Sequence, residues 1–269
     1  MRYSRRFRRF VRTRFLILAL IVGIFLLSLS EPIAYLFYHG LTPPCSSAPQ
    51  VTVKENVLLV GDLHVRRSDS SKRFEGLRTF ILKHNVSVLV IVGDLFDSPS
   101  DFSSLVKDLG GKEAVMKWLL GVLGVDGLDL DIYYVIGSIS HDPQFPNLNY
   151  TFRGTSFQSV GKCLKLRVYG FNLVVLHGDA VVSGPVGFII TRLTGVPVFE
   201  RLFKLCVGLS EDEWVVMAHT HVPLIDHGWR VANTGGWVRT PLQTPTGMGV
   251  LITKHGVKLV KVAEGSTSK

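Results

Sequence analysis

Residues 57–64 read Val-Leu-Leu-Val-Gly-Asp-Leu-His, and residues 88–94 read Val-Leu-Val-Ile-Val-Gly-Asp. Each stretch is a short apolar run closed by Gly-Asp, a pattern typical of a buried strand that ends in a turn. Between them, residues 74–84 carry apolar side chains at helical spacing. Strand, helix and strand in this order predict a βαβ unit, and hence an α/β fold with a mostly parallel sheet.

The rest of the chain divides by composition into three parts. We expect an Arg-rich tail and membrane-anchor segment over residues 1–41, a Pro- and Ser-rich linker over 42–56, and a catalytic domain over 57–269. Within that domain, an apolar insert with interspersed arginines covers residues 180–208. Further strands are predicted over residues 132–136, 164–169, 173–176, 215–218 and 249–253, and one helix over 105–120.

The positive charge is concentrated at the start of the chain. Residues 1–14 hold seven arginines and no acidic residue, and without them the chain carries 23 basic against 21 acidic residues. The chain contains 46% hydrophobic residues, which excludes a disordered protein. The residues after position 14 are nearly neutral in net charge, which argues against a nucleic-acid partner. Cys45, Cys163 and Cys206 stand apart from one another, so we predict neither a zinc cluster nor a disulfide framework.

The apolar run that follows the arginines predicts a membrane location. Residues 15–30 contain no charged residue, and a helix continued to Tyr38 would span ~36 Å, enough to cross a bilayer. The arginines place the N-terminus in the cytoplasm, so a single-pass span leaves the catalytic domain outside, our preferred side. A monotopic insertion interrupted at residues 31–32 and a cleaved signal peptide are the alternatives.

Polar side chains recur where the predicted strands end, at Asp62 and His64, Asp94 and Asp97, His141 and Asp142, His177 and Asp179, and His219 and His221. Any one of these alone is more often a helix cap or a satisfied core residue. Five at successive strand ends favour one shared site, because ligand sites of open α/β sheets lie at the carboxyl ends of strands. Imidazole and carboxylate ligands suit Mn, Fe and Zn. The ligands exceed the needs of one ion and predict a metal pair of the kind that catalyses phosphoryl displacement.

These five motifs, in this order over residues 57–255, resemble those of the calcineurin-like metallophosphoesterases. The resemblance implies a four-layer α/β/β/α sandwich and two divalent ions, for which we expect Mn²⁺ ahead of Fe, Zn or Ni. It also implies the following roles: Asp62, His64 and His221 on one ion, His177 and His219 on the other, Asp94 bridging both, Asp97 and Asp142 behind the ligands, and His141 as proton donor.

The third motif departs from the family pattern. Residues 137–142 read Gly-Ser-Ile-Ser-His-Asp, where the family has Gly-Asn-His-Asp or Gly-Asn-Arg-Asp with a metal-ligating Asn. We expect Ser140, or else Ser138 or water, to take the place of that ligand.

Within the family, the insert at 180–208 and the segment 233–237 are most similar to the UDP-diacylglucosamine pyrophosphohydrolases. This similarity implies a lipid-facing cap in which Arg192 and Arg201 meet a phosphate or headgroup and Phe188 and Phe203 are exposed beside the metals. A core helix pair is the alternative.

The resulting expectation is a membrane-anchored phosphohydrolase that cleaves a phosphoester or pyrophosphate of a small-molecule, nucleotide-linked or lipid-linked substrate. A nuclease or phosphodiesterase, and a non-catalytic binding module on the same fold, are the alternatives.

Overall fold

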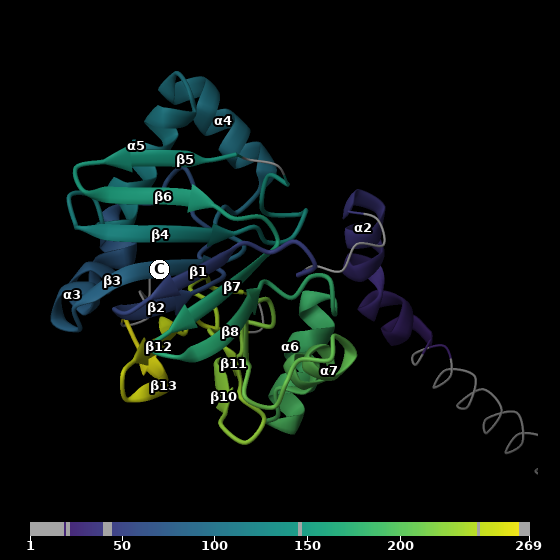
Figure 1. Ribbon diagram of the computed structural model, residues 1–269. Helices are drawn as coiled ribbons and strands as arrows, with labels where there is room; N and C mark the ends of the chain where they lie inside the picture. Colours follow the sequence, from purple (N-terminus) through teal and green to yellow (C-terminus); the bar gives the residue numbers. More distant parts are fainter. Residues whose placement is uncertain (1–18, 20–21, 40–44, 145–146, 241–242, 264–269) are drawn as a thin grey trace, which may run out of the picture.

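Two β-sheets lie face to face at the centre of the molecule (Figure 1). The computed structural model describes the chain except for residues 1–18, 20–21, 40–44, 145–146, 241–242 and 264–269. The seven-stranded sheet has the order β13 (Gly256–Lys261), β12 (Met248–Thr253), β2 (Asn56–Val60), β3 (Val86–Val92), β4 (Leu130–Val135), β6 (Thr155–Ser159), β5 (Asn149–Phe152). The six-stranded sheet has the order β1 (Gln50–Val53), β7 (Cys163–Val168), β8 (Phe171–Leu176), β9 (Trp214–Met217), β11 (Val231–Asn233), β10 (Leu224–Asp226).

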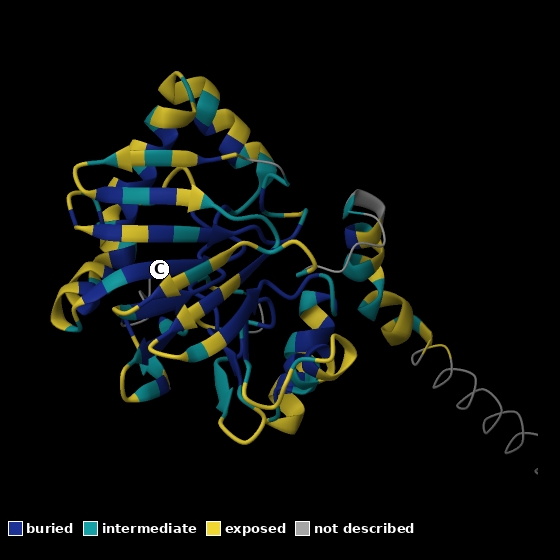
Figure 2. Cartoon of the chain, in the orientation of Figure 1, coloured by how far each residue is buried: buried dark blue, intermediate teal, exposed yellow. Residues whose placement is uncertain are grey.

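Strands β2, β3, β4 and β6 are parallel, as the βαβ pattern predicts, and so are β8, β9 and β11. The apolar runs are continuous because both faces of each sheet are covered. In β2, Val57 and Leu59 lie in the core between the sheets, whereas Leu58 and Val60 lie in the core beneath the outer helices. Figure 2 shows the resulting buried interior.

Helices complete the other two layers. The outer face of the seven-stranded sheet is covered through α3 (Glu75–Lys83), α4 (Pro99–Leu109) and α5 (Lys112–Leu123), with a 3₁₀ turn over Ser71–Phe74. On the outer face of the six-stranded sheet, α7 (Val198–Cys206) packs through Phe203, beside α6 (Gly184–Thr194). The predicted α/β/β/α layering is therefore present.

Three expectations need correction. The helix expected over 105–120 is two helices, because Gly110 and Gly111 adopt positive φ and end α4. The linker expected over 42–56 contains β1, which joins the six-stranded sheet beside β7. Cys45 and Cys163 form a disulfide, although the sequence indicated none, and Cys206 is free and exposed.

The predicted location at a membrane is contradicted. Within the part of the chain that the structure describes, no helix combines the length and apolar character needed to cross a bilayer. The seven arginines and residues 15–18, 20 and 21 of the first apolar run lie outside the described residues. Helix α2 (Ser30–His39) instead contacts the folded body, where Tyr35 is buried and its ring lies 5.7 Å from Nζ of Lys162.

Candidate metal centre

All five polar motifs meet at one edge of the two sheets. The loops after β2, β3 and β4 come from the seven-stranded sheet, and those after β8 and β9 come from the six-stranded sheet. Among the described residues, three overlapping groups of side chains there could hold a metal ion: the first is Asp62, His64 and His221, the second is Asp94, His177 and His219, and the third, which shares a residue with each of the others, is His64, Asp94 and His141. The sheet pairing thus joins residues that are up to 159 positions apart in the sequence.

The backbone is strained where these side chains leave the strands. Asp62, His64, Asp94, His219 and His221 all have φ between 43° and 67°, a region that non-glycine residues seldom occupy. Strained backbone conformations of this kind cluster at functional sites, where the packing of the surrounding structure stabilises them. The packing around these residues is close. A Cβ on Gly93 would lie 2.3 Å from Nδ1 of His177, so only glycine fits there.

In the first group, buried ligand atoms lack a hydrogen-bond partner. Oδ2 of Asp62 accepts the backbone N–H of His219 at 2.9 Å, but its Oδ1 has none, and neither does Nε2 of His64. Nε2 of His221 lies 3.9 Å from Oδ1 of Asp62. A buried polar atom without a partner is costly, and a shared cation about 2.1 Å from each atom would satisfy them. These residues therefore fit a metal ion.

In the second group, the hydrogen bonds of the neutral histidine rings direct two imidazole lone pairs towards each other. Nδ1 of His177 lies 3.1 Å from the carbonyl of Val92, which can only accept, so Nδ1 carries the proton in the neutral ring. Nε2 of His177 then faces Nδ1 of His219 at 3.0 Å and Oδ1 of Asp94 at 3.2 Å. Three ligand atoms thus converge on one point.

Asp94 lies between the two groups. Its Oδ1 faces His177, while its Oδ2 lies 3.9 Å from Nε2 of His64. Burial disfavours the ionised form, but the nearby His177 outweighs this and holds the pKa of Asp94 well below its usual range. For His177, burial would lower the pKa, but the carboxylate of Asp94 raises it to about 10. A cation bound here would therefore displace a proton.

Of the two residues predicted behind the ligands, Asp97 contacts two of the histidines. Asp97 has its Oδ1 3.8 Å from Nδ1 of His64, and its carbonyl lies 2.6 Å from Nδ1 of His141. Asp142 is buried and accepts the backbone N–H groups of Phe96 and Gly137. Its burial, together with the charge of Asp94, raises the pKa of Asp142 to about 6.

The third motif places a different serine at the centre from the one we preferred. Ser138 is buried and donates from both its backbone nitrogen and its hydroxyl to Oδ1 of Asp94, at 2.8 and 2.9 Å. Ser140 is exposed and reaches the centre only through a 3.0 Å contact with Ser138. The expectation of Ser140 as the residue beside the ligands is therefore corrected.

A pocket of about 490 Å³ opens over the ligands. Arg66 and Arg239 line it, and Arg66 pairs with Asp97 at 3.1 Å. The predicted phosphate-binding arginines do not line it: Arg192 is exposed on α6, and Arg201 pairs with Asp226. Sequence reasoning missed Arg66, Arg239 and Glu31, a further lining residue that α2 carries into the pocket.

The insert contributes one apolar wall of the pocket rather than a fully exposed patch. Phe188 of α6 lines the pocket with Pro185, and Val238 lies in the same lining. Phe203, which we expected on the same surface, is 5% exposed and packs in the core beneath α7.

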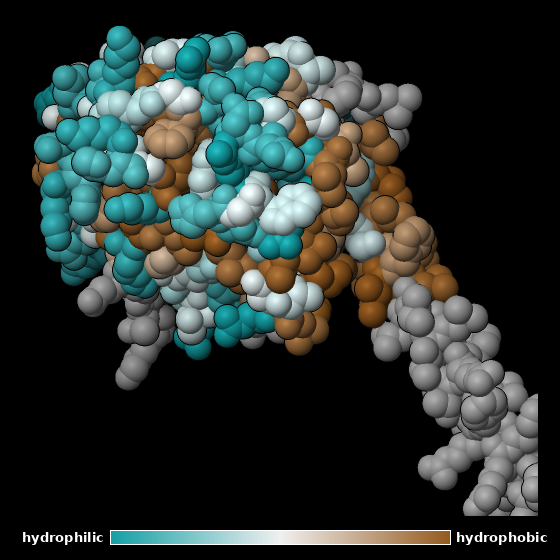
Figure 3. All heavy atoms as spheres, turned by 60° about the horizontal axis from the view of Figure 1, so that its bottom comes forward, coloured by the Kyte–Doolittle hydropathy of each residue, from teal (hydrophilic) through white to brown (hydrophobic). Residues whose placement is uncertain are grey.

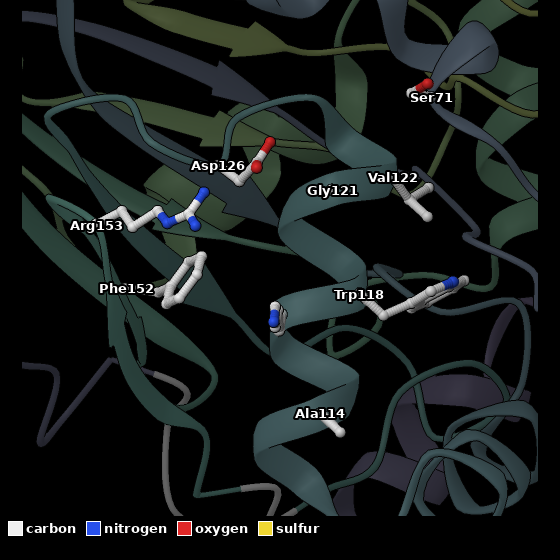
Figure 4. Close-up of a pocket in the computed structure, with 9 residues that line it drawn as sticks. Ser71, Ala114, Trp118, Gly121, Val122, Asp126, Phe152 and Arg153 are labelled. Atoms are coloured by element: carbon white, nitrogen blue, oxygen red, sulfur yellow. The ribbon is translucent and has the colours of Figure 1, made fainter.

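A second pocket, of about 520 Å³, lies along α5 and shares no lining residue with the first (Figure 4). Its lining includes Trp118, Phe152 and Arg153, and among the described residues that line it no histidine is present. The guanidinium of Arg153 lies 4.9 Å from the ring centre of Phe152. This pocket has no group of metal ligands.

The sequence matches no family model and no curated protein. Among solved structures, YfcE, a phosphoesterase from E. coli, is 13% identical, with a TM-score of 0.41 over 77% of this chain and 100% of its own. A novel archaeal phosphodiesterase is 10% identical (TM-score 0.36, 76% and 98% covered), and the Pseudomonas putida nuclease MPE is 16% identical (TM-score 0.31, 76% and 87% covered).

Proposed function

We propose that this protein is a two-metal phosphohydrolase that cleaves a phosphoester or pyrophosphate bond. The observation that carries the proposal is the position of Asp94, whose carboxylate belongs to two groups of ligands at once. Two bound divalent cations, for which we propose Mn²⁺, would polarise the phosphoryl group and lower the pKa of the attacking water.

The side chains around the ligands have separate tasks in this proposal. His141 lines the pocket, and the carbonyl of Asp97 fixes its Nδ1–H, so its Nε2, which lies 3.9 Å from Oδ2 of Asp94, can carry the proton for the leaving group. Arg66 and Arg239 meet the negative charge of the phosphate. The departing oxygen is thereby neutralised while the phosphate is held.

We also propose that the substrate has an apolar portion, as a lipid-linked phosphate or pyrophosphate has. The support is the apolar part of the pocket lining, formed by Pro185, Phe188 and Val238. Ile189 and Leu193 extend apolar surface along α6, where they are 47% and 81% exposed. Figure 3 shows apolar side chains, in brown, gathered on the side of the molecule where α2 lies, to the right of the view.

The proposal is tested by metal analysis together with a substrate panel. We expect two ions per chain and Mn²⁺-dependent hydrolysis of a chromogenic phosphoester, with faster hydrolysis of a lipid-linked pyrophosphate than of its soluble counterpart. A chain that binds metal without hydrolysing any member of the panel would indicate a binding module instead.

A further inference from the structure

Helix α2 reaches the metal centre through a single carboxylate. Glu31 lies in its first turn, and its Oε2 is 2.8 Å from Nε2 of His219 and 3.4 Å from the backbone nitrogen of Gly184. Glu31 also lines the pocket over the ligands. No strand-end motif contains this residue, which lies 31 positions before Asp62 in the sequence.

The contacts of His219 determine which of its nitrogens faces the ligand group. Nε2 faces two acceptors, the carboxylate of Glu31 and the carbonyl of Val182, each at 2.8 Å. Because acceptors can pair only with an N–H, the proton of the neutral ring belongs on Nε2. Nδ1 then presents its lone pair towards His177 and Asp94, where the second group of ligands converges.

The start of helix α6 holds the carboxylate in place. Ser183, the N-cap of α6, makes no side-chain capping hydrogen bond. Its backbone N–H instead donates to the carbonyl of Ser28 at 3.2 Å, and that of Gly184 points to Glu31. Acceptors at and just before α2 thus pair with two backbone N–H groups at the start of α6, and the helix dipole favours a negative charge there.

We propose that Glu31 is a positioning residue of the metal centre, which accepts the Nε2–H of His219 and thereby directs Nδ1 to the second ion. This inference rests on the function proposed above and adds a residue outside the five motifs. A carboxylate behind a metal-ligating histidine orients the ring and strengthens it as a ligand. Loss of such a partner typically lowers metal affinity about 10- to 100-fold.

The test compares metal binding by the full-length chain and its Glu31→Gln variant. Each protein is stripped with chelator and titrated with Mn²⁺ by calorimetry and with Co²⁺ by absorption, which reports ligand geometry. Glu31→Gln keeps the shape of the side chain but removes its charge. Glu55→Gln, an exposed carboxylate in the turn before β2, is the matched control.

We expect the native protein and Glu55→Gln to bind two ions alike. Glu31→Gln should bind one ion with native affinity and the other about 10- to 100-fold more weakly, with an altered Co²⁺ spectrum. The amide oxygen of Gln can still accept the Nε2–H of His219, so Glu31→Ala, which removes the acceptor, is titrated as well. Native affinities at both sites in Glu31→Gln and Glu31→Ala would overturn the inference and leave the proposed function intact. This holds even if the metal-free variants melted earlier, because that pattern indicates a purely structural contact. A native chain that binds no metal would overturn the proposed function itself. If Glu31→Gln did not fold, Glu31→Asp would replace it, since its shorter carboxylate cannot reach His219.

Discussion

Nδ2 of Asn233 lies 2.7 Å from Oε1 of Glu200, in a fully buried contact that joins β11 to α7. The same amide nitrogen contacts the carbonyl of Ala218 at 2.6 Å and the hydroxyl of Thr220 at 3.2 Å, immediately beside the two histidines of the last motif. Helix α7 therefore supports the metal centre from behind, although none of its residues lines the pocket.

Glu200→Gln should become more stable relative to the native protein as the pH rises. Burial raises the pKa of Glu200 above its usual 4.5, partly offset by the hydrogen bond from Asn233. Below pH 4.5 the folded and unfolded states are both protonated, whereas at higher pH the unfolded state ionises first and native stability is lost. Gln has no such proton. Urea unfolding from pH 4.5 to 8 measures the difference, and one that did not change with pH would contradict the raised pKa.

Asp94→Ala should lose both metal ions, because the carboxylate belongs to the group with His177 and His219 and also to the group with His64, a residue of the first group. His177→Ala should lose mainly the ion of the second group. Elemental analysis of the purified chains gives the stoichiometry, and activity should fall by several orders of magnitude in Asp94→Ala. Two ions per chain in Asp94→Ala would rule out the bridging role.

Phe188→Ser and Phe203→Ser should have different effects on activity and stability, because one residue lines the pocket and the other lies in the core. Phe188 lines the pocket, so its replacement should spare hydrolysis of a small soluble phosphoester and slow that of a lipid-linked substrate. Phe203 is buried, and its loss should cost ~3–5 kcal/mol of stability and lower both activities together. Melting temperatures and paired assays test this, and parallel losses in both variants would argue against an apolar subsite.

Cys45→Ser should lower the free energy of unfolding by about 2–4 kcal/mol, because the disulfide with Cys163 closes a long loop in the unfolded chain, with a sequence separation of 118. Cys206→Ser is the control, since that cysteine is free and exposed. Denaturation with and without reductant gives the comparison. Native and Cys45→Ser proteins of equal stability under oxidising conditions would show that the bond is not formed.

The sequence alone determined the strands of the parallel sheet and the convergence of the five motifs. Long apolar runs such as residues 88–92 are compatible with few structures other than a strand covered on both faces. A polar residue directly after such a run must lie at the strand's carboxyl end, whatever the rest of the chain does. The candidate ligands could therefore be read from local pattern.

Only the tertiary structure decided what surrounds them. Glu31 interrupts an apolar run, and the sequence offered a bilayer as its setting, whereas in the fold it meets His219, 188 positions later. Arg66 lies in the pocket and Arg201 is paired with Asp226, although both are arginines near motifs. Such contacts depend on how separate helices and loops pack against one another. The periodicity of apolar residues does not encode that packing. It shows which face of a helix or strand is buried, but not which other helix or strand that face packs against.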